Sequence, residues 1–194
     1  MLKLKNKSIF KKFSKAFLTS IIIISAYTGF SEYTSGPLGA NAGIDFMWDA
    51  DPNYVKLRYL QSSKRRNDRS TYYLFLRARD RKTGILKLTI NIPDYFSAKI
   101  QSKKLTLCQA TVGGFRAKTK CKEEIPAVIE VNKDQTKIEI FPDNPIPLDN
   151  KTYALRMKIF NPRKAMMFQF HAYAQSPGSL PISGYVGSWN MDVQ

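Results

Sequence analysis

Apolar and polar residues alternate with a period of two along most of the chain after residue 53. Residues 86–92 show the pattern most clearly, with Leu and Ile separated by Lys, Thr and Asn. Such alternation is typical of β-strands that bury one side and expose the other. The same pattern recurs at residues 55–59, 72–77, 105–108, 129–131, 137–140, 155–159 and 168–173.

Turn-forming residues separate these segments. Asn-Lys-Asp-Gln at 132–135, the proline-rich stretch at 142–147 and Ser-Pro-Gly-Ser at 176–179 are typical of turns and loops. About seven to eight short antiparallel strands at this spacing predict an all-β, immunoglobulin-like sandwich. Only residues 93–100 leave room for a helical turn. We therefore expect a single β-sandwich domain over residues 54–194.

The N-terminal 42 residues have a different character. Six lysines precede an apolar run at residues 16–30, and a small-residue stretch ends in Ala40-Asn41-Ala42. This order is typical of a secretory signal peptide over residues 1–42. The apolar run is shorter than the roughly 20 residues of a membrane-spanning helix, so we expect cleavage, after Ala42 or earlier near Ala26. A retained membrane anchor is the alternative, and residues 43–53 are expected to form a loose segment.

Because a signal peptide directs export, we expect the protein in the periplasm or cell envelope, or in a thylakoid lumen. Export also bears on Cys108 and Cys121, the two cysteines of the chain. An even number of cysteines in an exported protein favours a disulfide. Closing a loop of this size would stabilise the fold by roughly 3 kcal/mol in the chain-entropy model. Two separate buried thiols are the alternative.

Positive charge is the strongest surface signal. The chain has 31 Lys and Arg against 15 Asp and Glu, a net charge of +16 that falls to +11 without residues 1–42. Most of this remaining positive charge lies between residues 56 and 82. If residues 54–60 and 71–79 pair as a hairpin, four of these cations share one outward face and repel one another, which favours an acidic partner. The ten residues of this predicted basic patch are Lys56, Arg58, Lys64, Arg65, Arg66, Arg69, Arg77, Arg79, Arg81 and Lys82.

Other chemistry is poorly supported. His171 is the only histidine, and the alternation places it on a polar strand face without a nucleophile motif. One histidine and two bridged cysteines do not make a standard zinc site. Asp45, Asp49 and Asp51 resemble part of a calcium loop, but the turn glycine and closing Glu are missing. We predict no enzymatic activity and no cofactor.

An aromatic pair next to the basic residues has two interpretations. Tyr73 and Phe75 alternate with the residues expected in the core and lie close to Arg77. They could stack against a sugar or a protein partner. The alternative is that they pack beneath a second sheet or beneath the N-terminal segment.

The C-terminal half resembles a known family. The segments that carry the resemblance include Thr-Ile-Asn-Ile-Pro (89–93), Phe-Pro-Asp-Asn-Pro-Ile-Pro (141–147), Phe-Gln-Phe-His-Ala-Tyr-Ala (168–174) and Pro-Ile-Ser-Gly-Tyr-Val-Gly (181–187). They are similar to a family of exported cyanobacterial proteins known as a domain of unknown function, over roughly residues 85–190. The resemblance implies a signal-bearing β-sandwich of the envelope or lumen with no assigned activity. The 108–121 insertion and the basic 56–82 segment depart from the family pattern. The sandwich also loosely resembles periplasmic copper-resistance C proteins, whose histidine and methionine ligands are not reproduced here.

These observations together predict an exported, non-enzymatic binding or structural module. Its basic hairpin would dock an acidic envelope component, namely an anionic lipid, an acidic polysaccharide or an acidic protein. Peripheral membrane contact is compatible with this hypothesis, whereas export argues against nucleic acid, the usual partner of such a patch. The alternative function is a small periplasmic metal or redox carrier that uses Cys108, Cys121 and His171. The sequence does not specify an oligomeric state.

Overall fold

The computed structural model describes residues 53–114, 116–178 and 182–194. The chain divides into two units, residues 1–40 and 41–194, and all described residues belong to the second. The predicted signal peptide, its cleavage sites and almost all of the predicted loose segment therefore lie outside the described residues.

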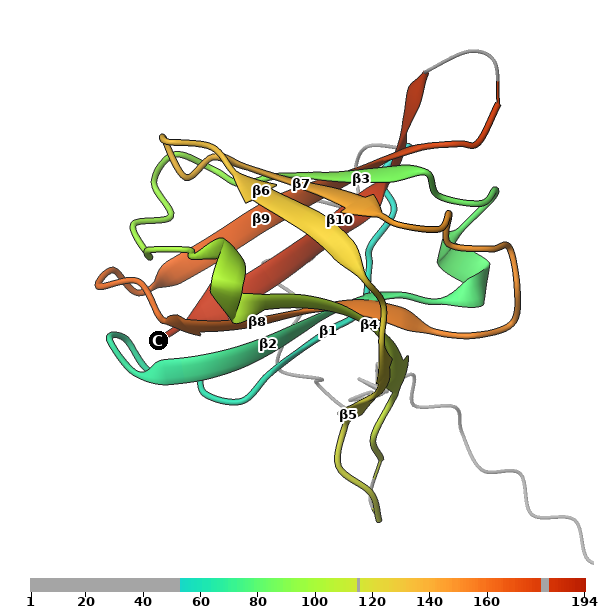
Figure 1. Ribbon diagram of the computed structural model, residues 1–194. Helices are drawn as coiled ribbons and strands as arrows, with labels where there is room; N and C mark the ends of the chain where they lie inside the picture. Colours follow the sequence, from blue (N-terminus) through green and yellow to red (C-terminus); the bar gives the residue numbers. More distant parts are fainter. Residues whose placement is uncertain (1–52, 115, 179–181) are drawn as a thin grey trace, which may run out of the picture. The chain divides into compact units, whose positions relative to one another are not determined.

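The described residues form two antiparallel five-stranded sheets (Figure 1). The first has the order β1-β2-β8-β4-β5 and the second β10-β9-β3-β7-β6. The strands of the first sheet are β1 (Tyr59–Gln61), β2 (Arg69–Leu76), β8 (Tyr153–Phe160), β4 (Leu105–Thr111) and β5 (Lys120–Glu124). Those of the second are β10 (Ser183–Val193), β9 (Met166–Gln175), β3 (Lys87–Asn91), β7 (Lys137–Pro142) and β6 (Ala127–Val131). The all-β sandwich prediction is confirmed.

Two of the ten strands were not expected from the sequence. β5 is a mostly exposed edge strand of charged residues, so it lacks an apolar face. β10 contains glycines and a register shift between Tyr185 and Gly187, which interrupt the alternation. The expected helical turn at 93–100 is a simple turn in which the Phe96 N–H donates to the Pro93 carbonyl, 3.0 Å away. Short 3-10 turns lie elsewhere, at η1 (Ala78–Asp80) and η2 (Ser102–Lys104).

The alternating apolar residues meet between the two sheets. Leu88 and Ile90 of β3 and Phe168 and Phe170 of β9 are fully buried, as the pattern predicts. Phe96 packs edge-on against both phenylalanines, with ring centroids 5.0 and 4.9 Å apart. Full burial of such a side chain contributes about 1.5–3 kcal/mol, so these residues together contribute substantially to the stability of the sandwich.

A second, smaller apolar cluster covers part of the first sheet. Phe75, Cys108, Ala110 and Ala154 are buried there, and Tyr73 stacks beside Phe75. Cys108 of β4 and Cys121 of β5 form a disulfide, which confirms the predicted pairing. Phe75 therefore packs inside the protein, so the sugar-stacking interpretation of this aromatic pair is wrong for Phe75.

Candidate anion-binding site

The predicted basic hairpin forms over only part of its length. β1 pairs with β2 from Tyr59 to Gln61, opposite Tyr72–Leu74. Residues 55–57 leave β2 and cross to the second sheet, where the Leu57 N–H donates to the Ser188 carbonyl at 2.8 Å. Lys56 consequently forms a parallel bridge with Ser188 of β10. The prediction that Lys56, Arg58, Arg77 and Arg79 share one face of a hairpin is therefore wrong.

Eight of the ten predicted cations form two groups at opposite ends of β2, whereas Lys56 and Arg58 precede β1. One group surrounds the β1–β2 turn, and the other follows the end of the strand around η1. Eight residues of extended chain separate the groups by roughly 23 Å. In Figure 1 the turn lies near the C-terminus, whereas η1 lies at the other end of the sandwich. The turn group is Lys64, Arg65, Arg66 and Arg69, and the η1 group is Arg77, Arg79, Arg81 and Lys82.

Two arginines of the η1 group are occupied by ion pairs. Arg77 donates two hydrogen bonds to the carboxylate of Asp80, at 2.8 and 2.9 Å. The Arg81 side chain is fully buried and donates to Oδ1 of Asp149 at 3.0 Å. Its guanidinium also lies over the Tyr153 ring, 4.6 Å from the centroid. Both arginines stabilise the fold, and the full burial of Arg81 contradicts the prediction that it faces an acidic partner.

The pKa values around Arg81 follow from this packing. Burial, and then the hydrogen bond to Asp149, raise the pKa of Tyr153 to about 12. For Asp149, burial alone would raise the pKa, but hydrogen bonds from Tyr153, the Lys151 N–H and Arg81 outweigh it and hold the pKa below its usual value. Asp149 is therefore ionised and Tyr153 protonated at neutral pH, which is the state that pairs best with Arg81.

The β1–β2 turn is held in place by one buried asparagine. Asn161, which is 3% exposed, donates through Nδ2 to the carbonyls of Ser63 and Arg65, at 2.9 and 2.7 Å. Its Oδ1 accepts a hydrogen bond from the Tyr72 hydroxyl. These bonds fix the backbone of the turn, and the exposed side chains of Arg65 and Arg66 project from it.

Four cations converge on a groove at this end of the molecule. Arg69, Lys99, Lys104 and Lys158 line a cavity of about 240 Å³, together with Gln101, Ile159 and Phe160. We call this site the turn-end groove. It contains no carboxylate among its described lining residues, and none of the four cations forms an ion pair within residues 53–114, 116–178 and 182–194.

Strand pairing explains why these cations meet. Arg69 of β2 lies opposite Phe160 of β8, and Thr71 lies opposite Lys158, so Arg69 and Lys158 are diagonal neighbours on the outer face. The Arg69 guanidinium lies over the exposed Phe160 ring, 5.4 Å from its centroid. The connection from β3 through η2 adds Lys99 and Lys104. Mutual repulsion of four uncompensated charges favours the binding of an anion.

Sequence reasoning identified only Arg69 of these four cations. Lys99, Lys104 and Lys158 are distant in sequence and appeared as isolated polar positions. The available signal was the alternation at 155–159, which places Lys158 on the outer face. The alternation does not indicate which strand pairs with residues 155–159, so it could not predict that Lys158 lies beside Arg69.

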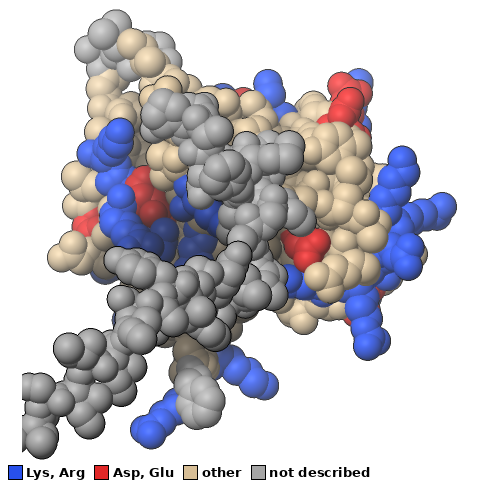
Figure 2. Space-filling view, turned by 180° about the vertical axis from the view of Figure 1, so that it is seen from behind, with Lys and Arg blue, Asp and Glu red and all other residues tan. Residues whose placement is uncertain are grey.

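The connection that follows β4, and β5 itself, which we together call the β4–β5 arm, carry a further set of cations outside the predicted patch. Cys121 joins the arm to Cys108 of β4 through the disulfide. Lys and Arg side chains lie in several separate groups on the face seen in Figure 2. Positive charge is thus distributed over the domain, and the turn-end groove differs from these exposed groups in that four cations line one cavity whose described lining contains no carboxylate. The exposed cations of the arm are Arg116, Lys118, Lys120 and Lys122.

His171 lies beside a serine that the sequence did not indicate. Its Nδ1 is 2.8 Å from Oγ of Ser188, which is also 2.6 Å from the Tyr185 hydroxyl. Ser188 is completely buried, so its hydroxyl is inaccessible to a substrate in this structure. Burial lowers the pKa of His171, which favours the neutral ring. This network joins β9 to β10 and has the geometry of a structural contact.

The described residues give little basis for the metal-carrier alternative. The sulfurs of Cys108 and Cys121 are bonded to each other and are not available as a thiol pair. Across the described part of the chain, His, Cys, Asp and Glu nowhere gather in threes in a way that could hold a metal. Asp45, Asp49 and Asp51 lie outside the described residues. In the same part of the chain, no helix is long and apolar enough to cross a membrane.

Comparison with known proteins places the chain in a family. Residues 48–193 match the family described as Protein of unknown function (DUF2808), and the chain belongs to it. The predicted resemblance to a domain of unknown function is confirmed to this extent. No curated protein matches the chain in sequence.

Solved structures show similar sandwiches at low sequence identity. The bacterial hydrophobin BslA is 13% identical with a TM-score of 0.45, covering 73% of this chain and 92% of its own. The collagen-binding domain of a Staphylococcus aureus adhesin is 13% identical with a TM-score of 0.39, covering 72% and 97%. The collagen-binding subdomain of the Enterococcus faecalis surface protein ACE is 8% identical with a TM-score of 0.41, covering 73% and 99%. At this low sequence identity, the similarity concerns the backbone fold alone.

Proposed function

We propose that this protein is an exported, non-enzymatic module that docks an acidic polysaccharide of the cell envelope through the turn-end groove. The observation that carries the proposal is the convergence of Arg69, Lys99, Lys104 and Lys158 on one groove whose described lining contains no carboxylate. The disulfide is consistent with export, because such bonds persist in oxidising compartments.

The shape of the site favours a polymer chain over a flat membrane. A groove can surround one carboxylate or sulfate group with several cations, whereas a bilayer surface meets only the outermost ones. Phe160, 58% exposed, offers an apolar face next to the cations, on which a sugar ring can pack. The exposed turn residues Arg65 and Arg66 extend the positive surface beyond the groove. Their contribution would be screened within about 8 Å at physiological ionic strength.

A matched pair of variants tests the proposal. The triple variant Arg69→Ser/Lys104→Ser/Lys158→Ser removes three charges from the groove. The control, Lys118→Ser/Lys120→Ser/Lys122→Ser, removes three exposed charges from the β4–β5 arm. Polygalacturonate is the acidic probe, with dextran as the neutral one, and binding is measured by calorimetry at low and high salt.

We expect the groove variant to bind polygalacturonate at least about tenfold more weakly, since removing even 1.4 kcal/mol of binding free energy has that effect. Its binding should also depend less steeply on salt, whereas the arm variant should stay within about twofold of the unchanged protein. Equal losses in the two variants would show that net charge alone drives binding. Loss of binding to phosphatidylglycerol vesicles without loss of polygalacturonate binding would replace the polysaccharide with a lipid surface.

A further inference from the structure

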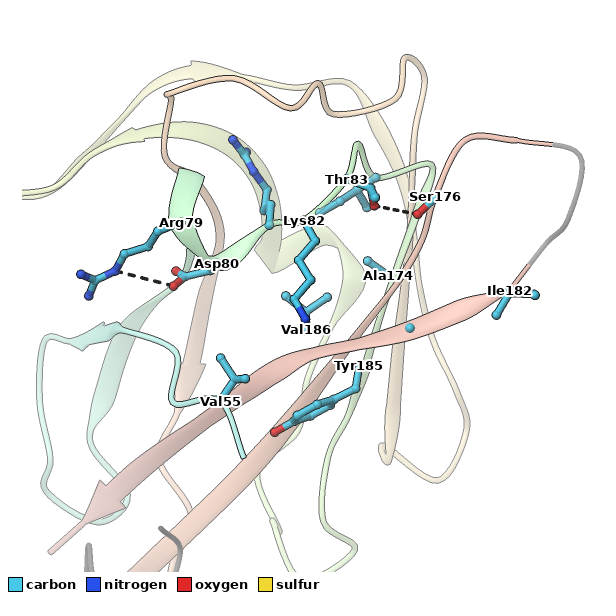
Figure 3. Close-up of a pocket in the computed structure, with 13 residues that line it drawn as sticks. Val55, Arg79, Asp80, Lys82, Thr83, Ala174, Ser176, Ile182, Tyr185 and Val186 are labelled. Carbon is cyan, nitrogen blue, oxygen red and sulfur yellow. Dashed lines mark hydrogen bonds and ion pairs between the residues drawn. The ribbon is translucent and has the colours of Figure 1, made fainter. Parts of the chain in front are cut away.

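A second cavity, of about 510 Å³, lies at the other end of the sandwich. Three parts of the chain surround it, as Figure 3 shows: residue 55, residues 79–85 around and after η1, and the end of the β9–β10 hairpin where β9 ends and β10 begins. We call it the η1 pocket. Its volume falls within the range of roughly 300–1,000 Å³ that is usual for small-molecule sites.

Much of the lining is apolar and incompletely buried. Val55 is 41% exposed, Ile182 69% and Tyr185 38%, which are high values for large apolar side chains that lie together. A ligand that covered them would remove this apolar surface from water, at about 25 cal/mol per Å². The apolar and aromatic lining consists of Val55, Ile85, Ala174, Ile182, Tyr185 and Val186.

The remaining lining has an excess of positive charge. Lys82 extends into the space shown in Figure 3 and points toward Val186, and it forms no ion pair within the described residues. Asp80 is 5% exposed in its side chain and receives both strong bonds from Arg77, so Arg79 approaches it only to 3.9 Å. The charged residues of the described lining are Arg79, Arg81, Lys82 and Asp80, which gives a net charge of +2.

These features together specify the class of ligand. A wholly apolar ligand would bury the Lys82 ammonium without a partner, which is costly. A fully hydrophilic anion would leave Val55, Ile182 and Tyr185 uncovered. We propose that the η1 pocket binds an amphiphilic anion, with its alkyl chain against β10 and its carboxylate at Lys82. This inference is independent of the turn-end groove.

Decanoate and decanol test the proposal because they share the alkyl chain and differ in charge. We expect the unchanged protein to bind decanoate about tenfold more tightly than decanol, a difference of about 1.4 kcal/mol. Lys82→Met keeps an apolar stem of similar length and should remove this preference while decanol binding stays the same. Lys118→Met, on the β4–β5 arm, is the matched control and should keep the preference.

A second variant tests the location without altering charge. Gly184 lines the pocket, and a Cβ built there meets no atom within 4 Å. Gly184→Leu should therefore fill the cavity while the fold is retained, and both ligands should bind at least about tenfold more weakly. Undetectable decanoate binding by the unchanged protein, a preference that survives Lys82→Met, or undiminished binding by Gly184→Leu would each overturn the proposal.

Discussion

Arg81 is the residue whose role differs most between sequence and structure. In the sequence it is one of ten cations in a basic segment, yet its side chain is fully buried and bonded to Asp149 and to the carbonyls of Asp149 and Lys151. Two of its nitrogens, Nε and Nη1, have no hydrogen-bond partner among the described residues. The Arg81 charge is thus stabilised by Asp149 and by the Tyr153 ring. Removal of either partner should therefore lower the free energy of unfolding strongly.

Asp149→Ala should lower the free energy of unfolding by about 3 kcal/mol. The value lies at the low end of the range for a broken buried pair, because the Asp149 side chain is 26% exposed. Urea unfolding measures the loss, with Asp143→Ala, at an exposed position just after β7, as the control. The double variant Arg81→Met/Asp149→Ala should recover much of the stability. A double variant no more stable than Asp149→Ala would show that Arg81 is not the source of the cost.

His171 predicts a pH dependence of stability. Burial lowers its pKa in the folded protein below the value of about 6.5 for an unfolded histidine. The unfolded state then binds more protons as the pH falls, so stability should decrease from pH 7.5 to pH 5.5. His171→Gln should flatten this dependence, because carboxylates titrate mostly below pH 5. Identical slopes for the two proteins in urea unfolding at these two pH values would contradict the assignment.

At the scale of elements, the close packing of residues 55–57 against β10 requires a glycine at one position of the strand. Gly187 has a φ of +153°, and a Cβ there would lie 2.7 Å from both the Leu57 Cγ and the Val55 carbonyl oxygen. The close approach lets residues 55–57 bond to Ser188 and cover this part of β10. The bulge at Tyr185 and Gly187 is therefore part of how the two sheets are joined at this edge.

Gly187→Ala should destabilise the protein by about 1–3 kcal/mol, since backbone near Val55 must move and the conformation is unfavourable for alanine. Gly184→Ala, in the same strand, meets no atom within 4 Å and should be close to neutral. Thermal unfolding of the two variants provides the comparison. Equal effects would show that the crossing of residues 55–57 does not depend on this glycine.

At the scale of the whole molecule, the two proposed sites lie far apart. The β1–β2 turn, which precedes the groove residue Arg69, lies near the end of β10, where the Arg66 N–H donates to the Gln194 carbonyl at 3.0 Å. The η1 pocket includes Gly184, Tyr185 and Val186 near the start of the same strand. The eleven residues of β10 span roughly 33 Å, several times the screening length at physiological salt.

The two sites should therefore be energetically independent. The triple groove variant should leave decanoate affinity within about twofold, and Lys82→Met should leave polygalacturonate affinity within about twofold. Additivity within about 0.5 kcal/mol is usual for positions this far apart. Titration of each probe in the presence of the other measures the coupling. A change larger than about tenfold in either direction would indicate one continuous binding surface.

Much of the fold was predictable because burial imposes a local pattern. The alternation at 86–92 and 168–173 identified β3 and β9 and their buried residues, and Cys108 and Cys121 indicated their disulfide. β5 was missed because both its faces are polar, and β10 because Gly187 interrupts the pattern. The site was less predictable, since only Arg69 of the four groove cations belonged to the predicted patch.

The sequence by itself determined an all-β sandwich, its core residues, its disulfide and its surplus of positive charge. Each depends on residue type or on neighbours two positions apart. Only the tertiary structure decided which cations act together. Residues 55–57 leave β2 for β10, Arg81 turns inward to Asp149, and β8 brings Lys158 beside Arg69. Strand order and long-range ion pairs set these contacts, and neither leaves a local pattern in the chain.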